Sequence, residues 1–431
     1  MVQFYKAIAA LAQKVKSSDA RNCRISQDIE IFSDFSAIDW LEAQPHYPRF
    51  FWQSRDTREE VVALGKIHTF TEPAPAYAIL SDDQRVWGGR AYDSQDERMP
   101  SYFFLPQIEL IRFDQHWTLN VNVGDEVSHA LAALSKLSSE FQKLPLFDAT
   151  ISSVTHAPEL PVWTEMVNTA LESIEQDQFK KVVLARKTEL ILNGGVSPAQ
   201  LIKASREQNN HSFHFLFALD SQSAFVGSTP ERLYSRIGNE LETEAVAGTI
   251  GRGPNAQKDM ELANWLAQDK KNLQENQYVV DDIVERLTPH ADEIDAQKEA
   301  NLIRLRKVQH LKKAIRASLK MGVNGVQLLS ALQPTAAVAG LPREAAINFI
   351  RDNEPFARGW YSGSLGFISH QKAEFCVAIR SAFFENNKVE LFAGAGIVPG
   401  SNADYEWQEL DRKMATLLSL LTENTSIEVA S

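Results

Sequence analysis

The chain has 431 residues, of which 44% are hydrophobic and 23% charged, as in soluble globular proteins with one large or two ordinary domains. Its formal charge of −12 argues against nucleic acid as a partner, because such binding depends on Lys and Arg contacts to phosphate, and against an anionic membrane surface. Cys23 and Cys376 provide neither a disulfide framework nor a zinc pattern, so we expect a cytoplasmic protein in a reducing compartment.

The first 160 residues combine helix and strand patterns with one irregular stretch. "MVQFYKAIAALAQKVKSS" interrupts its apolar residues with lysines, which is typical of an amphipathic surface helix rather than a signal peptide. No window has 18 apolar residues, so we expect no membrane span. "RFFWQS" and "EVVALGKI" predict strands, and "SHALAALSKLSSEFQKL" predicts a helix. Residues 143–161 contain three prolines and no clear period, which indicates a connector.

Beyond this connector, strands come in neighbouring pairs and helices in separate runs. "FKKVVLAR", "HSFHFLFAL", "SAFVGS" and "ETEAVAGT" predict strands, and we expect helices over about 260–288, 304–320 and 404–421. "EFCVAIRSAFF" and "KVELFAGAGIV" predict a hairpin with "ENN" at its turn. This arrangement favours an α+β architecture with antiparallel sheets, in which the connector either divides two domains or crosses one large unit.

A lysine in the strand "FKKVVLAR" points the same way as interior side chains. In an extended chain Lys181 shares a face with Val183 and Ala185. Either the strand begins one residue later and this lysine lies in water, or it is buried and acts as a general base. A general base must be neutral for part of the time, and moving a lysine pKa from roughly 10.4 to about 7–8 costs roughly 4 kcal/mol. Burial and cationic neighbours drive that shift.

Glu231 lies in "GSTPERL", a tight turn that directly follows an apolar strand. The preceding Pro230 restricts the backbone of this turn. Glu231 is therefore either an ordinary acid of a turn or helix start, or a carboxyl group held rigidly at a strand end. The second interpretation makes it a candidate general acid.

Carboxylates on two predicted helices suggest a metal site. Asn276 lies on the apolar stripe of the first helix with Glu275 beside it, so that stripe is either hydrated or supplies buried partners. In the last helix, Glu406, Glu409 and Lys413 form one row along an edge. Glu409 and Lys413 form either a surface pair worth about 0.2–0.5 kcal/mol or part of a site. Glu406 and Glu409 together with Glu275 would offer the oxygen ligands that suit Mg²⁺.

Two glycine stretches follow predicted strands, where ligand-binding loops often lie. "AGAGIVPG" follows a strand, but no helix opens after it and Pro399 interrupts the place where one would begin, which excludes a dinucleotide fingerprint. "AVAGT" at 245–249 places small residues after a strand, where backbone N–H groups can approach a carboxylate or a phosphate.

Ten motifs occur in an order that resembles the chorismate-utilising enzymes, the family of anthranilate synthase large subunits, isochorismate synthases and salicylate synthases. They are "FKKVVLAR", "GSTPERL", "TEAVAGT", "QEN", "RKVQHL", "LQPTAAVAGLPR", "WYSGSLGF", "FCVAIRSA", "LFAGAGIV" and "EWQELDRK". The resemblance is dense over about 155–425, and "YPRFFWQSR" is similar to the menaquinone-pathway isochorismate synthases. It implies an anthranilate synthase component I-like fold, with two packed antiparallel sheets and helices outside. Residues 1–150 would form the N-terminal part of this unit and 151–431 its chorismate-binding catalytic region.

The resemblance also implies roles for the charged residues. Lys181 falls on the base that activates water for attack at C2 of chorismate, and Glu231 on the acid that protonates the departing C4 hydroxyl. Glu275, Glu406 and Glu409 fall on the Mg²⁺ positions, with Glu409 favoured as a direct ligand and Glu406 close by or acting through water. The positions implied to meet the substrate are Gly248, Thr249, His310, Tyr361, Arg380, Gly394, Ala395, Gly396 and Lys413.

Within the family, two positions favour water as the nucleophile. The ammonia-using anthranilate synthases resemble this chain but have glutamine in place of Lys181, and Ala247 stands where some relatives carry a nucleophilic lysine. We therefore expect no glutaminase partner, and the reaction has no redox step that needs a nicotinamide or flavin. Salicylate synthase, a siderophore-pathway isochorismate synthase and a non-catalytic sensor on the same fold are the alternatives. A sensor would be expected to lack Lys181, Glu231 or the metal carboxylates.

Overall fold

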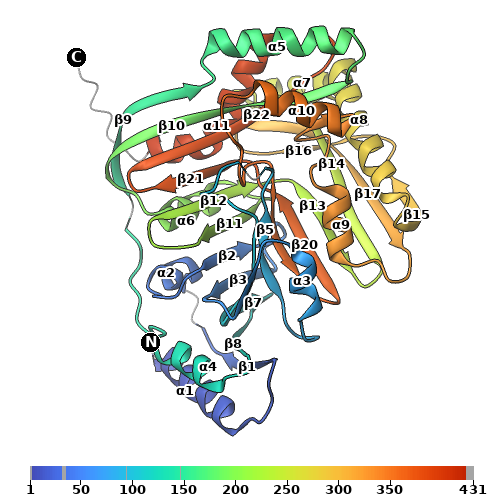
Figure 1. The fold of residues 1–431 in the computed structure, drawn as a ribbon. Coiled ribbons are helices and arrows are strands. Elements are labelled where there is room, and N and C mark those ends of the chain that lie inside the picture. Colours follow the sequence, from blue (N-terminus) through green and yellow to red (C-terminus); the bar gives the residue numbers. More distant parts are fainter. Residues whose placement is uncertain (1, 32–34, 94, 146, 424–431) are drawn as a thin grey trace.

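Two large β-sheets lie face to face, and helices cover their outer faces (Figure 1). The computed structural model describes residues 2–31, 35–93, 95–145 and 147–423. Neighbouring strands pair antiparallel in both sheets. The predicted α+β class with two packed antiparallel sheets is thus confirmed.

The larger sheet has twelve strands among the described residues, in the order β1-β8-β7-β3-β2-β11-β12-β21-β22-β10-β18, with β9 paired to β10. These strands are β1 (Cys23–Ile29), β2 (Arg49–Gln53), β3 (Glu59–Leu64), β7 (Ile108–Phe113), β8 (His116–Val123), β9 (Asp148–Ala157), β10 (Lys181–Gly195), β11 (Phe213–Ala218), β12 (Ser223–Thr229), β18 (Gly340–Leu341), β21 (Ser381–Glu385) and β22 (Lys388–Ile397).

The smaller sheet has ten strands within the same residues, in the order β15-β17-β14-β13-β20-β19-β5-β6-β4, with β16 paired to β17. These strands are β4 (His68–Phe70), β5 (Val86–Arg90), β6 (Tyr102–Leu105), β13 (Arg232–Ile237), β14 (Glu240–Gly251), β15 (Ala291–Ala296), β16 (Asn301–Arg304), β17 (Val308–Leu319), β19 (Ser364–Ile368) and β20 (Lys372–Val377).

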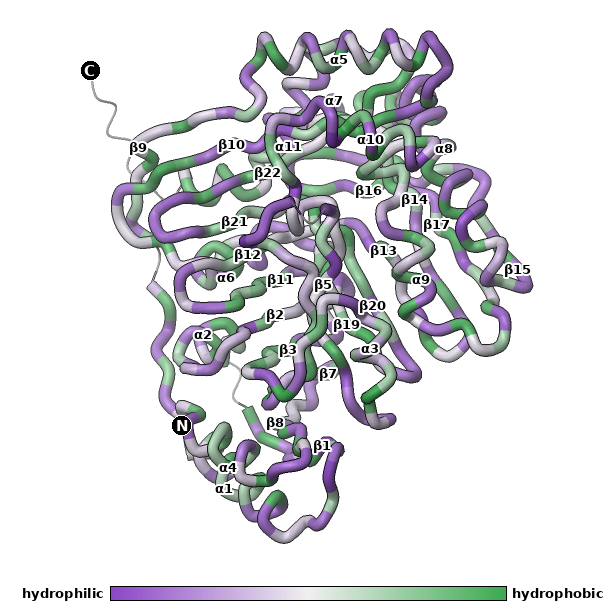
Figure 2. The backbone as a smooth tube through the Cα atoms, viewed as in Figure 1, coloured by the Kyte–Doolittle hydropathy of each residue, from purple (hydrophilic) through white to green (hydrophobic). Residues whose placement is uncertain are grey.

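Helices pack on the outer faces of both sheets, with α6, α10 and α11 on the larger sheet and α8 and α9 on the smaller one. Figure 2 shows hydrophobic and hydrophilic residues alternating along the helices, as expected where one helix face is buried. None of the described helices combines the length and apolarity needed to span a bilayer. The helices are α1 (Val2–Ser17), α2 (Ala37–Glu42), α3 (Pro73–Ala78), α4 (Val127–Ser135), α5 (Leu160–Glu175), α6 (Pro198–Gln208), α7 (Ala256–Leu266), α8 (Lys270–Leu287), α9 (Gly325–Leu332), α10 (Arg343–Asn353) and α11 (Ala403–Glu423).

An aromatic layer fills the space between the sheets. Phe50 on β2 packs against Trp87 on β5 with ring centroids 5.5 Å apart, and Phe217 on β11 stacks on Trp360 at 4.9 Å. These four side chains are buried. Because burying one such side chain contributes about 1.5–3 kcal/mol, this layer is a main source of the attraction between the sheets.

Strands from the first 150 residues are built into both sheets. β2 pairs with β11 in the larger sheet, and β5 pairs with β19 in the smaller one. The N-terminal strands therefore complete sheets that the remainder of the chain begins, and the connector at 143–161 leads from one part of the larger sheet to another.

The predicted helix at 304–320 is wrong, because this segment forms β17 between β14 and β15. Its Lys, Ala and Leu content suits a helix by propensity. From Leu311 to Leu319, however, every second residue is buried, which is the period of a strand. Pairing with β14 over ten positions outweighed the local propensity.

Three other boundaries differ from the sequence-based expectation. The helix predicted over 260–288 is two helices, because Asp269 caps the second one by accepting a hydrogen bond from Asn272 N. The predicted connector contains β9, which pairs with β10. The helix predicted from Ser128 ends at Ser135, well before its apolar pattern does.

The segment "EFCVAIRSAFF" is two strands rather than one. β20 belongs to the smaller sheet and β21 to the larger one, so the chain crosses between the sheets at 378–380. Arg380 lies at this crossing with a φ of 52°, a left-handed conformation that is unusual for a non-glycine residue. The hairpin with its turn at Asn386 is the β21–β22 pair alone. This crossing brings Arg380 between the two sheets.

Candidate active site

A pocket opens between the two sheets and reaches α8 and α11. Its wall combines β10 and β22 of the larger sheet with β14 and β17 of the smaller one. Most of the residues singled out from the sequence line it. They are Glu231, Gly248, Thr249, Glu275, His310, Tyr361, Arg380, Gly394, Gly396 and Lys413.

Lys181 is the first residue of β10 and is fully buried, whereas its neighbour Lys180 is exposed. The alternative that Lys181 lies in water at the strand end is therefore wrong. Its Nζ lies 3.2 Å from Glu275 Oε1 and makes no well-aligned hydrogen bond to another described residue. A buried ammonium with one carboxylate neighbour is costly, since polar groups normally complete their hydrogen bonds when they leave water.

Gly396 explains how Lys181 and Glu275 come so close to β22. A Cβ at this position would lie 2.1 Å from Glu275 Oε1 and 3.1 Å from Lys181 Cε. Only glycine therefore leaves room for both side chains. Ala395 lies next to it, but its side chain belongs to the apolar core on the other face of the sheet.

Glu231 lies in the turn between β12 and β13 and is 4% exposed. Burial, followed by the charge of Glu244, raises the pKa of Glu231 to about 8. Lys181, Lys413 and Arg380 oppose this shift without cancelling it. The carboxyl group of Glu231 consequently carries its proton at neutral pH, which is the state that a general acid requires.

His310 links two residues of the pocket wall. Its Nε2 lies 2.9 Å from Arg380 Nη2, and its Nδ1 lies 3.0 Å from Thr249 Oγ1. An arginine can only donate, so Nε2 accepts and the imidazole proton is on Nδ1. Burial and the charge of Arg380 hold the pKa of His310 well below its usual value, so the ring is neutral. Thr249 Oγ1 accepts this proton, which leaves its own hydroxyl hydrogen available for the pocket.

Cationic and aromatic groups define the other end of the pocket. Nη1 of Arg380 has no hydrogen-bond partner in the described part of the chain, and burial lowers the pKa of this arginine to about 10. Lys413 Nζ donates to Gly394 O at 2.8 Å. Tyr361 stacks on Phe392 with ring centroids 5.1 Å apart, and a Cβ at Gly394 would lie 2.8 Å from its Oη. An unpaired guanidinium beside an ammonium is a binding site for a carboxylate.

Gly248 lies at a bulge where β14 loses register with β17 between Val246 and Thr249. Its φ of +83° belongs to the left-handed region that glycine adopts without strain. Asn276 on the apolar stripe of α8 is not hydrated. It is fully buried and donates to the carbonyls of Ala245 and Ala247 at 3.2 Å. α8 is thereby tied to the bulge that lines the pocket.

The three carboxylates proposed for Mg²⁺ come from α8 and α11, and each has a lysine partner. The donor set is all oxygen, which suits Mg²⁺. Burial, followed by the charge of Glu409, raises the pKa of Glu406, so these carboxylates repel one another. Within the described residues no three His, Cys, Asp or Glu side chains are grouped closely enough to hold a metal ion. The residues fit Mg²⁺ by donor type, and their assignment stays a prediction. The pairs are Lys181–Glu275 (3.2 Å), Lys271–Glu406 (2.6 Å) and Lys413–Glu409 (2.6 Å).

Sequence reasoning missed a buried ion pair behind the pocket wall. Arg358 donates to Glu354, to Val183 O at 2.7 Å and to Val338 O at 2.8 Å. Glu354 in turn accepts from Ala185 N at 2.8 Å. On this edge β10 pairs with β18 at its start and with β9 from Lys187 onward, and the Arg358–Glu354 pair bonds the backbone groups of β10 that lie between these two strands. In the sequence, Glu354 and Arg358 look like an ordinary surface pair after a helix, so nothing there predicted their burial.

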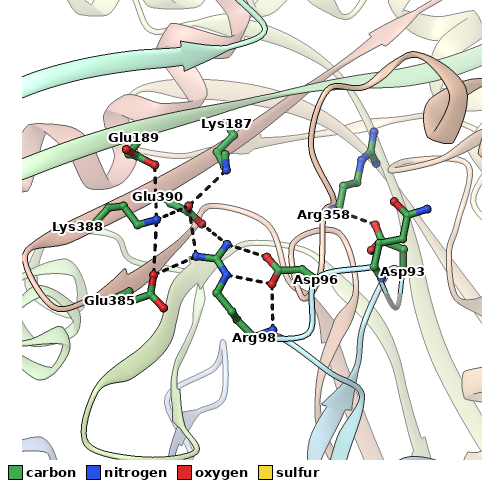
Figure 3. A network of polar contacts seen from close by, with 10 residues as sticks. Asp93, Asp96, Arg98, Lys187, Glu189, Arg358, Glu385, Lys388 and Glu390 are labelled. Atoms are coloured by element: carbon green, nitrogen blue, oxygen red, sulfur yellow. Dashed lines mark hydrogen bonds and ion pairs between the residues drawn. The ribbon is translucent and has the colours of Figure 1, made fainter.

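A second polar network lies beside this pair (Figure 3). Asp93 accepts from Arg358 N at 2.9 Å, and Arg98 joins the same loop to β22 through Glu390 at 3.0 Å. The labelled side chains come from the loop after β5, from strands β10, β21 and β22, and from the segment between α10 and β19, which carries Arg358. This network holds the loop against the sheet that carries Lys181.

Comparisons of the sequence and of the fold with known proteins point to the same group of enzymes. A sequence profile described as chorismate binding enzyme matches residues 77–422. The chain is 41% identical over 397 residues to the isochorismate synthase MenF of Escherichia coli (strain K12), covering 90% of this chain and 91% of that protein. The solved structure of the menaquinone-specific isochorismate synthase MenF from Escherichia coli superposes with a TM-score of 0.90 at 39% identity, over 97% of this chain and 100% of that one. Anthranilate synthase component I from Streptococcus pneumoniae shares the fold, with a TM-score of 0.61 at 19% identity over 93% of each chain.

Proposed function

The chain belongs to the family of chorismate-binding enzymes, as its motifs indicated, and we propose that it is an isochorismate synthase of the menaquinone-pathway type. The observation that carries this proposal is a pocket lined by the buried, protonated Glu231 and by Arg380 with its unpaired Nη1, where the buried Lys181 lies directly behind Glu275 of the pocket wall. Lys181 and Glu231 are close enough that the lysine charge acts on the glutamate carboxyl group. Such a pair can add water to a ring and remove a hydroxyl group without any redox step.

The proposed reaction exchanges one hydroxyl group for another. Lys181 in its neutral form takes a proton from water as the water oxygen bonds to C2 of chorismate. The ring double bonds shift, and the C4–O bond breaks. Glu231 gives its proton to the departing oxygen, which leaves as water. One water enters and one leaves, so chorismate and isochorismate are isomers and the enzyme is an isomerase.

The two carboxylates of chorismate explain the charged groups around the pocket. Arg380 and Lys413 are proposed to bind the enolpyruvyl carboxylate, with Tyr361 alongside. Gly394 and Gly396 line the pocket, and the backbone of Ala395 connects them. A guanidinium with a free Nη1 offers the fork that a carboxylate accepts. Thr249, oriented by His310, and the backbone at Gly248 face the rest of the substrate.

Mg²⁺ is the proposed cofactor, and Glu275, Glu406 and Glu409 would hold it. When bound, the ion would orient the ring carboxylate and offset its charge. Glu275 also lies beside Lys181, so one side chain serves both the cation site and the base. Glu409 remains the favoured direct ligand, because burial opposes its charge but Lys413 outweighs burial and holds its pKa low.

We also propose that residues 1–150 and 151–431 act as one catalytic unit without a glutaminase subunit. Support for one unit comes from the strands of residues 1–150 that complete both sheets. Lys181 in place of glutamine supports water rather than ammonia as the nucleophile.

Product analysis tests the proposed function. Purified protein incubated with chorismate and Mg²⁺ should form isochorismate, and a chelator should stop the reaction. Salicylate with pyruvate would instead identify a salicylate synthase, and anthranilate formed with ammonium would contradict the role of water. Absence of any turnover with Mg²⁺ would favour a sensor. Lys181→Ala is the matched control for contaminating activity.

A further inference from the structure

The turn that carries Glu231 is held by a charged residue from the N-terminal part of the chain. Arg55 follows β2 and donates through Nη1 to Pro230 O at 2.7 Å. The same guanidinium forms a two-pronged pair with Glu244 of β14, in which Nη2 donates to Oε2 at 3.0 Å. Arg55 therefore binds the residue before Glu231 while anchored to the other sheet.

Glu244 holds the other side of the same turn. Its Oε1 accepts from Arg232 N at 3.0 Å, and its Oε2 lies 2.6 Å from Lys312 Nζ of β17. The carboxylate is 4% exposed. One ion cluster thus binds the carbonyl before Glu231 and the N–H after it, which leaves the backbone of the acid little freedom.

The charge of this cluster also acts on Glu231. Burial opposes the charge on Glu244, but Arg55 and Lys312 outweigh burial and hold the pKa of Glu244 below its usual value. A negative charge close to a second carboxyl group disfavours ionisation of that group. After burial, the charge of Glu244 has the largest effect on the pKa of Glu231, and it raises this pKa.

Other charged groups face Glu231 from the elements packed around it. Lys181 of β10, Lys413 of α11 and Arg380 between β20 and β21 favour its ionised form. The thiol of Cys376 on β20 is buried nearby and neutral, since burial raises its pKa well above the usual value. Three cations therefore pull Glu231 toward ionisation, and Glu244 is the anion that opposes them.

We propose that Arg55 and Glu244 are positioning residues for the proton donor: Arg55 fixes the turn of Glu231, and the charge of Glu244 keeps that carboxyl group protonated. This inference rests on the proposed role of Glu231. It explains why a residue from the N-terminal part of the chain is needed at a site whose other members lie beyond residue 180. The reasoning that singled out Lys181, a charge within an apolar strand, also applies to Glu244 in "ETEAVAGT".

Infrared difference spectroscopy tests the charge effect without catalysis. The C=O band of the protonated carboxyl group is assigned to Glu231 by its loss in Glu231→Gln, and its pH midpoint is then followed. Glu244→Gln should move the midpoint to lower pH by about one unit, since a like charge is removed. Lys312→Met removes a cation beside Glu244 and should move the midpoint to higher pH. This second variant changes a partly exposed side chain and covers the case in which Glu244→Gln does not fold.

Steady-state kinetics test the positioning role. Arg55→Lys keeps the charge but replaces the planar fork, which holds Pro230 O and both Glu244 oxygens, with a compact ammonium, so kcat per folded molecule should fall about tenfold with KM unchanged. Its infrared midpoint should stay at the wild-type value. Arg24→Lys is the matched control, because Arg24 pairs with the buried Glu109 at 3.4 Å in the N-terminal part of the larger sheet. It should change neither kcat nor the midpoint.

The two ideas fail separately. Wild-type midpoints in both Glu244→Gln and Lys312→Met would overturn the charge effect, and wild-type kcat in Arg55→Lys would overturn the positioning role. Full activity of Glu231→Gln would instead overturn the proposed proton donor, whatever the spectra of the other variants show.

Discussion

Two regions of this protein bury charge, and they treat it in opposite ways. In the network of Figure 3, Arg98 bonds Asp96, Glu385 and Glu390, and Glu390 also receives Lys187 and Lys388. Beside and within the pocket, by contrast, Lys181 forms an ion pair with Glu275 alone among the described residues, and Nη1 of Arg380 has no partner there.

The pKa shifts follow the same division. In the network, hydrogen bonding to Asp96 raises the pKa of Arg98, and Lys187, Arg98 and Lys388 together outweigh burial and lower the pKa of Glu390. Both shifts favour the charged forms. In the pocket, burial raises the pKa of Glu231 and lowers that of Arg380, which favours the neutral forms. Charges with all their partners in place stabilise the fold, whereas charges that lack partners are available to a substrate.

Replacing Lys181 should give the largest effect. Lys181→Met removes the proposed base and should lower kcat by at least about 10³-fold, near the upper range for general-base catalysis. Its folding should remain intact, because an apolar side chain of similar length replaces a buried ammonium. Stopped assays with product separation measure kcat, and near-UV circular dichroism checks the fold. Turnover at the wild-type rate would refute the assignment.

Replacing Glu231 should have a slightly smaller effect. Glu231→Gln removes the proton donor while keeping its shape, and kcat should fall by about 10²–10⁴-fold. Because the carboxyl pKa is about 8 in the folded protein and near 4.5 when unfolded, wild-type stability should decline as pH rises from about 5 to 8 and level off above that. The variant lacks this decline, so its melting temperature relative to wild type should rise between about pH 5 and pH 8. Parallel melting curves would contradict the raised pKa.

Removing the unpaired cation should affect binding more than folding. Arg380→Gln should raise KM for chorismate by about 10–100-fold, since a hydrogen bond to a charged group contributes about 1.5–3 kcal/mol. Its melting temperature should fall only slightly, because the variant loses the Nη2 bond to His310 but Nη1 has no partner to lose. An unchanged KM in this variant would show that Arg380 does not bind the carboxylate of chorismate.

Breaking the satisfied network should give the reverse pattern. Glu390→Gln leaves the cations around it without their shared partner and should cost about 3 kcal/mol of unfolding free energy. The kcat per folded molecule should stay at the wild-type value. Urea unfolding measures the loss, and a kcat that falls in proportion would mean that the network also supports catalysis.

The smallest effect is expected at the edge of that network. Lys388→Met removes a partly exposed lysine beside Glu390 and should cost less than about 1 kcal/mol. It is the matched control for Glu390→Gln, because both changes remove one charge from the same cluster. Equal losses in the two variants would show that burial of the carboxylate does not decide the cost.

Residues whose surroundings are set by their own strand or turn were predictable. The alternation of side chains along a strand predicted that Lys181 points the same way as interior residues, and its complete burial confirms this orientation. Most of the other candidate residues line one pocket, to which both sheets and the helices α8 and α11 contribute. Helix propensity failed at 308–319, where pairing with β14 decided the structure.

The sequence by itself determined the family and the class of fold and predicted candidate site residues, because each of these depends on short stretches of chain. Only the tertiary structure decided which distant charges meet. Arg55 and Glu244 lie 189 positions apart, yet they share one ion cluster at the turn of Glu231. Local periodicity states which way a side chain faces, but the neighbour it finds there depends on how two sheets pack, and that neighbour sets the charge state on which the chemistry depends.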